Sequence, residues 1–402
     1  MSTESSSRGV SGQAAPAVLQ VLPRLETGGV ERGTVEIAEA LRAAGALPVV
    51  ISAGGQLERE LDRMDAIHVR LPVHSKNPLT MWRNVEAIVD VIRRYDVKLV
   101  HARSRAPAWS ARAAARRCGV PFVTTFHGAY NRGPFGIKGG YNAVMASGDR
   151  VIAISQFIAR HVQELYRVPQ SRIRVIPRGV DFDRFDPARV SPERMIALAT
   201  QWRLREDLPV IMLPGRLTRW KGQLTVIEAL ARLGRKDLIC LLVGSDQGRT
   251  RYRERLEAAV TAKGLESVVH VVNGCNDMAA AYLLTDYVIS ASTDPEAFGR
   301  VIVEAQAMGR PVIATRHGGA LETVTPGETG WLVAPSDPGE LAQAIAHALD
   351  TPTEERARMA EICRRHARQN YGRELMCART LAVYAELLGA DAPWAGEVDA
   401  AS

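Results

Sequence analysis

Short apolar runs alternate with longer amphipathic stretches along the first half of the chain. The runs have the length of buried strands and lie at residues 18–22, 48–52, 98–101, 122–126, 150–154 and 173–176. The stretches between them place apolar residues at helical spacing, at residues 30–44, 80–94, 108–118 and 155–166. Strands that alternate with helices in this way predict a parallel sheet covered by helices on both faces.

The same pattern begins again in the second half. Strands are predicted at residues 210–214, 238–243, 270–272, 287–290 and 311–314, and helices from 223 onward and at 299–308, 338–349, 353–369 and 373–388. Between the halves, Pro187, Pro192 and Pro209 indicate a linker. We therefore expect two α/β domains, residues 16–185 and 209–370, joined by a linker at 186–208, with disordered tails at 1–15 and 389–402.

The composition is that of an ordinary globular protein, with 46% hydrophobic and 24% charged residues among 402. No apolar run approaches the roughly 20 residues that a membrane-spanning helix needs, and the first residues have no apolar core of a signal peptide. The five cysteines are scattered, without a C-x-x-C pair. Together these features predict a cytoplasmic protein without a disulfide framework or zinc site.

Residues 295–315 carry the most informative pattern of the chain. A polar loop follows the strand at 287–290, and a helix is predicted to begin near Gly299. The start of a helix presents free N–H groups and a partial positive charge, which suit an anion. Glu296 and Glu304 lie on either side of this point, and two carboxylates would repel a bare phosphate. They favour a phosphate with hydroxyl-rich groups at both ends, as in a nucleotide-sugar.

Two further segments could approach phosphate at strand-to-helix junctions. In GRLTRWKG, residues 215–222, Arg216 and Lys221 follow a predicted strand and precede a helix. Arginine offers a planar fork to phosphate oxygens, and lysine offers a point charge. Gly28 and Gly29 lie at the first strand-to-helix junction, where the backbone allows close approach of a ligand. A plain tight turn is the alternative there, because the spacing is not G-x-G-x-x-G.

The segment PEAFGRVIVEAQAMGRPVIA, residues 295–314, resembles the retaining glycosyltransferases of the GT-B fold, glycosyltransferase family 4. The GRxxxxKG segment and TFHG at residues 125–128 continue the resemblance, which covers nearly all of residues 18–388. It implies two Rossmann-like, doubly wound α/β domains that face each other across a cleft. The final helix, 373–388, is expected to return to the first domain, which would bind the acceptor, and the second domain would bind the nucleotide-sugar.

The resemblance also implies a role for each motif residue. Arg216 and Lys221 would grip the donor diphosphate and stabilise it as it leaves, Glu296 would bind sugar hydroxyls, and His127 would contact the transferred sugar. Glu304 would accept hydrogen bonds from the ribose. The expected catalytic residues are thus His127, Arg216, Lys221 and Glu296, and the expected donor-binding residues are Gly28, Gly29, Arg216, Lys221, Phe298, Gly299 and Glu304.

No cofactor or metal is expected besides the donor substrate. Asp181 and Asp183 form a D-x-D, a pattern that binds divalent metal in other glycosyltransferases. The family resemblance instead places this segment at the entrance to the linker, and members of the family need no metal. Ser155, which follows a predicted strand, is best interpreted as a helix N-cap. The loop at residues 273–278 is expected to line the nucleotide base.

Basic residues are concentrated between Arg93 and Lys138. Ten Lys or Arg residues face one acidic residue, Asp96, in this segment. An anionic lipid surface attracts each such charge by about 1 kcal/mol, and the candidates for apolar contact are Val144, Met145, Tyr130 and Phe135. We therefore expect peripheral contact with the inner face of the cytoplasmic membrane through residues 93–138. Nucleic acid is disfavoured, because no nucleic-acid-binding motif accompanies the charge.

The sequence thus predicts a retaining, metal-independent hexosyltransferase. It would move a hexose from a nucleotide-diphospho-sugar to a glycan or anionic glycolipid, in the biosynthesis of lipopolysaccharide or another cell-surface polysaccharide. Two alternatives stay open. One is an enzyme of another class on the same fold, either a nucleotide-sugar epimerase or a glycogen-phosphorylase-like enzyme. Additional acidic and histidine residues would be expected of the epimerase, and a lysine-bound pyridoxal phosphate of the phosphorylase. The other is a catalytically silent nucleotide-sugar-binding protein, against which the complete set of Arg216, Lys221, Glu296 and Glu304 counts.

Overall fold

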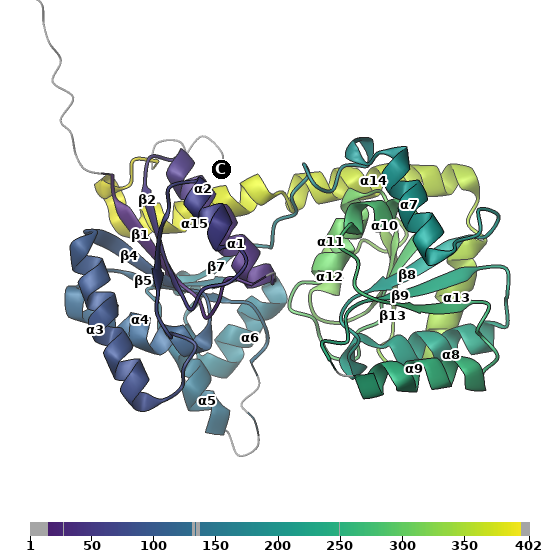
Figure 1. Cartoon of the computed structure of the whole chain (residues 1–402), viewed down its shortest axis with the longest axis horizontal. Helices are drawn as coiled ribbons and strands as arrows, with labels where there is room; N and C mark the ends of the chain where they lie inside the picture. The colour runs from purple at the N-terminus through teal and green to yellow at the C-terminus, as the bar shows by residue number, and fades with distance from the viewer. Residues whose placement is uncertain (1–14, 27, 131–132, 134–136, 249, 395–402) are drawn as a thin grey trace, which may run out of the picture. The chain divides into compact units, whose positions relative to one another are not determined.

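The computed structural model describes residues 15–26, 28–130, 133, 137–248 and 250–394 (Figure 1). The expected tail at 1–15, apart from Ala15, lies outside the described residues, as do Phe135 and Arg132 of the basic segment. The chain divides into two compact units. The first unit comprises residues 1–125, 139–151 and 378–402, and the second comprises 126–138 and 152–377.

The first sheet has seven strands in the order β3-β2-β1-β4-β5-β6-β7. The strands are β1 (Ala17–Val21), β2 (Leu47–Ser52), β3 (Ile67–Arg70), β4 (Val97–Ala102), β5 (Phe122–Phe126), β6 (Arg150–Ala153) and β7 (Ile173–Val175). The helices that connect them are α1 (Gly29–Ala43), α2 (Glu58–Arg63), α3 (Pro78–Arg94), α4 (Arg105–Cys118), α5 (Ile137–Asn142) and α6 (Gln156–Tyr166). The strand order reverses between β1 and β4, so the loops after these two strands flank a topological switch point.

Three elements in or around the first sheet, α2, α5 and β3, were not predicted from the sequence. Helix α2 is only six residues long, and β3 is a four-residue edge strand whose residues are half-buried or exposed. A short, partly exposed edge strand carries no continuous apolar run, so hydrophobic periodicity does not reveal it. Leu57 and Leu61 of this region still enter the core beneath α1, where they join Leu22, Val35 and Val50.

The second sheet has six strands in the order β10-β9-β8-β11-β12-β13. The strands are β8 (Val210–Pro214), β9 (Ile239–Val243), β10 (Val269–Val272), β11 (Tyr287–Ser290), β12 (Val312–Thr315) and β13 (Gly330–Val333), and every strand pair in this sheet is parallel. The helices are α8 (Gln223–Leu233), α9 (Thr250–Ala262), α10 (Met278–Leu283), α11 (Arg300–Ala307), α12 (Ala320–Thr323), α13 (Pro338–Leu349) and α14 (Thr353–Asn370). The order reverses between β8 and β11, which places a second switch point at the loops that carry the sequence motifs.

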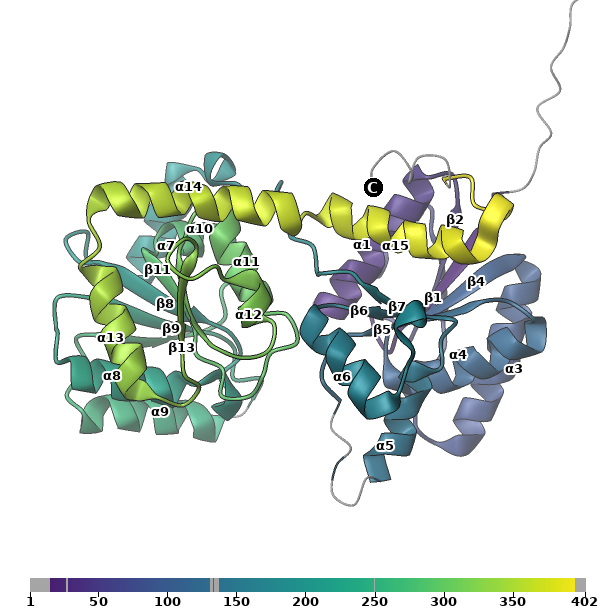
Figure 2. The same ribbon diagram turned by 180° about the vertical axis from the view of Figure 1, so that it is seen from behind.

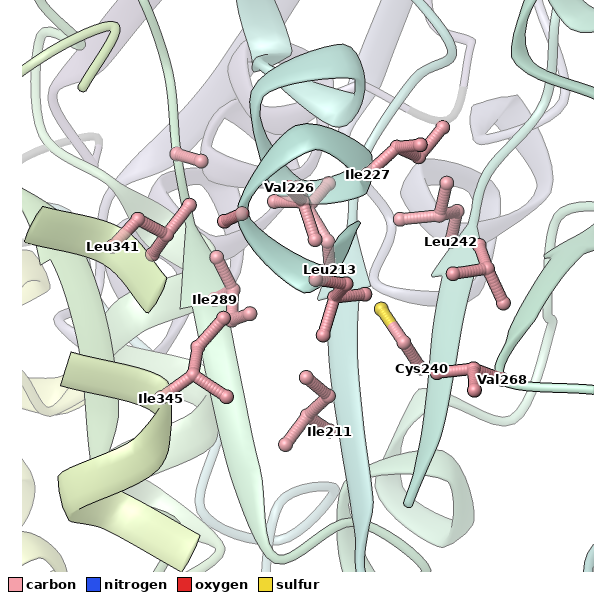
Figure 3. Packing of buried hydrophobic residues seen from close by; sticks show 14 of the residues in the cluster. Ile211, Leu213, Val226, Ile227, Cys240, Leu242, Val268, Ile289, Leu341 and Ile345 are labelled. Atoms are coloured by element: carbon pink, nitrogen blue, oxygen red, sulfur yellow. The ribbon is translucent and has the colours of Figure 1, made fainter. Parts of the chain in front are cut away.

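The core of the second sheet explains why its strands are continuous apolar runs in the sequence. Helices α8, α9 and α13 pack on one face, and α10, α11 and α14 lie over the other (Figure 1, Figure 2). Figure 3 shows Ile211 and Leu213 of β8 packed against Val226 of α8 and Ile345 of α13. Since both faces are covered, every residue of β8, β9 and β11 is buried.

The stretch at 186–208 contains a helix that the pattern did not predict, α7 (Pro192–Trp202). Ser191 caps it by accepting a hydrogen bond from the backbone N–H of Arg194. Trp202 is buried, and the Arg194 guanidinium lies 2.6 Å from a carboxylate oxygen of Asp277. Three prolines suggested an open linker, yet Pro192 lies at the first position of the helix, where proline is tolerated.

The last helix, α15 (Arg373–Leu388), belongs to the first unit from residue 378 onward and makes a buried polar contact within it. The Tyr384 hydroxyl lies 2.7 Å from Nδ1 of His101 on β4, and Oγ1 of Thr125 lies 2.7 Å from Nε2 of the same ring. Residues 389–394, part of the expected tail, also pack: Trp394 is buried and donates a hydrogen bond to the Leu381 carbonyl. None of the described helices has the length and apolar composition needed to cross a bilayer.

His101 is neutral in this environment. It is fully buried, and burial, helped by the charge of Arg103, holds its pKa well below the usual value. The neutral ring has one N–H and one lone pair, so one hydroxyl donates to it and the other accepts from it. Below a pH of about 6.5, His101 binds a proton in the unfolded chain but stays neutral in the folded chain. His101 therefore stabilises the fold above that pH, and its contribution is lost as the pH falls.

We expect His101→Gln to reduce the fall in melting temperature between pH 7.5 and 5.5, measured by calorimetry. The fall will not vanish, because burial also lowers the pKa of four other histidines, His68, His161, His270 and His366. Substitution of the exposed His74 by Gln is the matched control and should reproduce the wild-type fall. An unchanged pH dependence in His101→Gln would contradict the assignment of a neutral, buried ring.

Candidate active site

The candidate site is built on two loops at the switch point of the second sheet. The loop at 215–222 follows β8 and contains Arg216 and Lys221, and the loop at 291–299 follows β11 and contains Glu296. Because parallel strands end at the same edge, both loops lie where open α/β sheets bind ligands. The local sequence holds the first loop in shape, since the Gln223 side chain donates a hydrogen bond to the Arg216 carbonyl at 3.0 Å. The guanidinium of Arg216 is exposed and makes no ion pair with any described residue.

Lys221 and Glu296 connect the two loops directly. The Lys221 ammonium lies 2.7 Å from Oε1 of Glu296, and the side chains are only 12% and 15% exposed. The hydroxyl of Ser292 donates to the same carboxylate oxygen. The ammonium also lies 4.6 Å from the centre of the Trp220 ring, a cation–π contact. The charged pair is therefore held by contacts from both loops at once.

A glycine turn after β12 fixes the position of the second loop. The N–H of Gly319 donates to the Glu296 carbonyl at 2.8 Å. A Cβ at Gly319 would lie 2.5 Å from Cα of Phe298, and a Cβ at Gly318 would lie 2.4 Å from the Glu296 carbonyl oxygen. Only glycine allows this close packing. Gly318 and Gly319 thus support the backbone of the Glu296 loop.

The start of α11 offers backbone groups to an anion. Gly299 precedes the helix with φ of +84°, a conformation that glycine adopts readily. The ring of Phe298 is buried and contacts Tyr371 edge-on, with centroids 5.5 Å apart. Phe298 can therefore contribute its backbone but not its side chain to a ligand. The first N–H groups of a helix have no partner within the helix, so those of Arg300 and Val301 are suited to an anion.

Glu304 lies one turn into the same helix. Oε1 is 2.9 Å from Nε of Arg300, and Oε2 accepts a hydrogen bond of 3.1 Å from the Tyr282 hydroxyl. The Glu304 side chain is 12% exposed. The sequence pattern identified Glu304 but neither of these partners. Tyr282 lies 22 residues upstream, at a distance in the chain that periodicity does not relate to Glu304.

The remaining predicted residues lie at the ends of strands in the first sheet. Gly28 is the N-cap of α1 and Gly29 its first residue, in the loop after β1 at the switch point. His127 follows β5 directly and is half-buried. Ser155 caps α6, because its side chain accepts a hydrogen bond from the N–H of Ile158 at 3.1 Å. Its interpretation as an N-cap is confirmed.

Asp181 and Asp183 contact arginines and a backbone amide. Asp181 Oδ1 accepts from the N–H of Asp183, and its other oxygen lies 3.7 Å from Arg373. The Asp183 carboxylate lies 2.8 Å from Arg189. Among the described residues, no group of three or more His, Cys, Asp or Glu side chains could hold a metal ion. At the expected base-lining loop, Asp277 caps α10, where its side chain accepts from the N–H of Ala280.

The basic segment at 93–138 is not one solvated face. Arg103 is buried and donates to Gln20, and Arg117 forms a double hydrogen bond with Glu86. The expectation that Val144 and Met145 provide apolar contact is wrong, because both are buried in the core. A pattern of charges along the chain does not show which side chains the tertiary fold turns inward.

Two family models match the chain. The model described as Glycosyltransferase Family 4 matches residues 27–184, and the model described as Glycosyl transferases group 1 matches residues 197–366. The chain belongs to glycosyltransferase family 4. A D-inositol 3-phosphate glycosyltransferase of Xylanimonas cellulosilytica is 32% identical over 306 residues, which cover 73% of this chain and 72% of the relative. This membership makes the protein a glycosyltransferase.

Solved structures agree with the family and confirm the GT-B fold. A glycosyltransferase from Rickettsia africae is 38% identical, with a TM-score of 0.87, and the match covers 94% of this chain and all of that one. HepE of Anabaena, solved in complex with UDP and glucose, is 25% identical, with a TM-score of 0.80. That match covers 92% of this glycosyltransferase and all of HepE. The predicted two-domain α/β architecture is therefore confirmed.

We expect Arg216→Ala and Lys221→Ala each to lower the turnover of sugar transfer by about ten- to a hundredfold. Each would remove a charged hydrogen bond to the leaving diphosphate in the roles that the family resemblance implies, and such a bond is worth roughly 1.5–3 kcal/mol. The fold should persist, since Glu296 keeps its hydrogen bond from Ser292 in the lysine variant. Arg219→Ala, which removes another exposed arginine of the same loop, is the matched control and should retain turnover. Near-normal turnover in both well-folded test variants would show the diphosphate assignment to be wrong.

Proposed function

We propose that this glycosyltransferase is a retaining, metal-independent hexosyltransferase that uses a nucleotide-diphospho-sugar. The observation that carries the proposal is the convergence of Arg216, the Lys221–Glu296 pair and the start of α11 at one switch point. Two cations and free N–H groups suit a diphosphate, and the carboxylate suits sugar hydroxyls. The similarity to HepE of Anabaena, solved with UDP and glucose, supports a donor of this class.

Donor binding would exchange the partners of the central ion pair. In the structure, Glu296 neutralises Lys221 at 2.7 Å. A diphosphate brings two or more negative charges, and Lys221 would turn towards it, while the freed Glu296 carboxylate would accept hydrogen bonds from the sugar. Glu304 would accept from the ribose hydroxyls. This exchange would explain why Lys221 and Glu296 are adjacent although they bind different parts of the donor, the diphosphate and the sugar.

The proposed reaction needs no carboxylate nucleophile. The bond between the sugar C1 and the diphosphate oxygen breaks, and the bond between C1 and the acceptor oxygen forms on the same face. The departing phosphate oxygen takes the acceptor proton. Arg216, Lys221 and the start of α11 would stabilise the charge that develops on the diphosphate, which is the electrostatic role otherwise supplied by a metal. His127 would position the sugar, with Gly28 and Gly29 facing the donor.

The acceptor in this proposal is an anionic glycan or glycolipid, in the biosynthesis of lipopolysaccharide or another cell-surface polysaccharide. The name of the Xylanimonas relative, D-inositol 3-phosphate glycosyltransferase, includes an anionic compound. The excess of basic residues between Arg93 and Lys138 provides attraction for such an acceptor. Several of these charges stay exposed, including Arg93, Arg94 and Arg116.

We also propose reversible contact of the first unit with the inner face of the cytoplasmic membrane. Leu79 and Trp82 of α3 are 56% and 61% exposed, which is unusual for large apolar side chains. Arg83 lies on the same helical face, since residues three and four apart are neighbours, and Lys76 precedes the helix. A tryptophan and a leucine flanked by exposed cations suit an interface with anionic lipid. These residues replace Val144 and Met145 as the apolar contacts.

The test of the proposed activity begins with a thermal-shift screen of UDP-, GDP- and ADP-sugars, because ligands of the native state raise the melting temperature. The best donor is then incubated with a short glycan acceptor in EDTA. We expect transfer to continue, and NMR of the product to show the anomeric configuration of the donor. Loss of transfer in EDTA that Mg²⁺ or Mn²⁺ restores would overturn metal independence, and an inverted product would overturn retention.

The same assay separates the alternative functions. A catalytically silent binding protein would show the thermal shift but neither transfer nor donor hydrolysis. A nucleotide-sugar epimerase would convert the donor to its epimer without any acceptor. Transfer to the acceptor, with no epimer formed, is the outcome that the proposal requires.

Membrane contact is tested by co-sedimentation with vesicles. The wild type should bind vesicles that contain anionic lipid, and binding should weaken with salt, because charge is screened within about 10 Å at 0.1 M. Combined Leu79→Ser and Trp82→Ser should release the protein while transfer to a soluble acceptor continues. Ile196→Ser, at a large apolar residue that is 65% exposed in the second unit, is the control and should bind normally. Equal binding to neutral vesicles, or binding to none, would contradict the proposal.

A further inference from the structure

The orientation of the Glu304 carboxylate is set by two neighbours. Oε2 accepts a hydrogen bond from the Tyr282 hydroxyl at 3.1 Å, and Oε1 lies 2.9 Å from Nε of Arg300. Rotation of the Glu304 carboxylate about its last side-chain bond would break the contacts with Tyr282 and Arg300. The Arg300 guanidinium offsets the charge of a carboxylate that is only 12% exposed. The neutral Tyr282 hydroxyl orients the carboxylate through its hydrogen bond.

Tyr282 is itself held firmly. Its side chain is fully buried in α10, and its ring contacts that of Phe185, with centroids 6.0 Å apart. The hydroxyl therefore points from a packed core towards α11, and it also lies 3.5 Å from the Val301 carbonyl. Burial, and then the charge of Glu304, raise the pKa of Tyr282 well above its usual value. The hydroxyl stays protonated and acts as a donor across the physiological pH range.

The two contacts leave Glu304 able to bind a diol. An ionised carboxylate has about four acceptor positions, two on each oxygen. Tyr282 uses one position on Oε2, and the Nε of Arg300 lies near Oε1 without hydrogen-bonding to it, so each oxygen retains at least one position. A ribose presents two adjacent hydroxyls, each of which can donate to one of these oxygens. Both bonds form only if the plane of the carboxylate is correctly turned.

We infer that Tyr282 is a positioning residue, which holds the Glu304 carboxylate in the orientation that receives the ribose hydroxyls of the donor. The inference rests on the proposed function, because it deepens the role of Glu304 in the same site. Tyr282 does not touch the donor and acts only through Glu304. Its hydroxyl thereby contributes to the discrimination between ribonucleotides and their deoxy analogues.

The test compares Tyr282→Phe with Tyr287→Phe. Both remove one hydroxyl from a buried tyrosine of the second unit, but Tyr287 lies on β11 with its ring against Trp331. The probe is whichever of UDP, GDP and ADP binds the wild type most tightly, together with its 2′,3′-dideoxy analogue, and calorimetry gives the Kd of each. Glu304→Gln is the reference that removes the carboxylate charge.

In the wild type the ribonucleotide should bind about ten- to a hundredfold more tightly than its dideoxy analogue, the range for hydrogen bonds to a charged group. Tyr282→Phe should weaken binding of the ribonucleotide by roughly two- to tenfold, which is less than loss of the ribose contacts themselves, because Glu304 remains and only its orientation is no longer fixed. Binding of the dideoxy analogue should change little. In the transfer assay, KM for the donor should rise by a similar factor with kcat nearly unchanged, as for loss of uniform binding. Tyr287→Phe should keep the wild-type preference.

Three outcomes would count against the inference. An unchanged ribose preference in Tyr282→Phe overturns it, and so does an equal loss of preference in Tyr287→Phe, which would indicate a general structural effect. Retention of the full preference in Glu304→Gln would overturn the ribose role of Glu304 on which it rests. If no nucleoside diphosphate binds the wild type, the proposed donor site fails, which is distinct from a failure confined to the tyrosine.

Discussion

The half-buried ion pair between Lys221 and Glu296 is the interaction on which the candidate site depends. It joins the loops after β8 and β11, which belong to adjacent strands but are more than seventy residues apart in sequence. Removing one member of such a pair leaves an uncompensated charge, which is costly away from water. Loss of either partner would therefore lower the stability of the two loops, unless a ligand takes the place of that partner. A diphosphate with a sugar attached can replace both at once.

The backbone around this pair is fixed by steric fit. Gly318 and Gly319 pack so closely against the Glu296 loop that any side chain would overlap it, and Phe298 anchors the loop through its buried ring. The backbone N–H groups at the start of α11 and the backbone that carries Glu296 are thereby pre-organised. Pre-organised charges and dipoles need little reorganisation during reaction, which is the main physical source of electrostatic catalysis.

Glu304 is supported in the same way one helical turn further on. Tyr282 and Arg300 hold its two oxygens, so the carboxylate is directed by residues from α10 and α11 together. The sequence identified the motif residues, whereas the contacts that support Glu304 are seen only in the tertiary structure. The first unit shows the same difference between sequence and structure. The basic segment was evident in the sequence, but the exposure of Leu79 and Trp82 was seen only in the structure.

The sequence by itself determined the alternation of strands and helices, the two sheets and the motif residues Arg216, Lys221, Glu296 and Glu304. These features depend on local periodicity and on short spacings, which a single chain displays directly. Only the tertiary structure decided the partner of each side chain. It placed Arg103 and Met145 in the interior, formed α7 within an expected linker, and brought Tyr282 to Glu304. The reason is that the spacing of apolar residues indicates which face of a helix or strand is buried, but it does not indicate which distant element packs against that face.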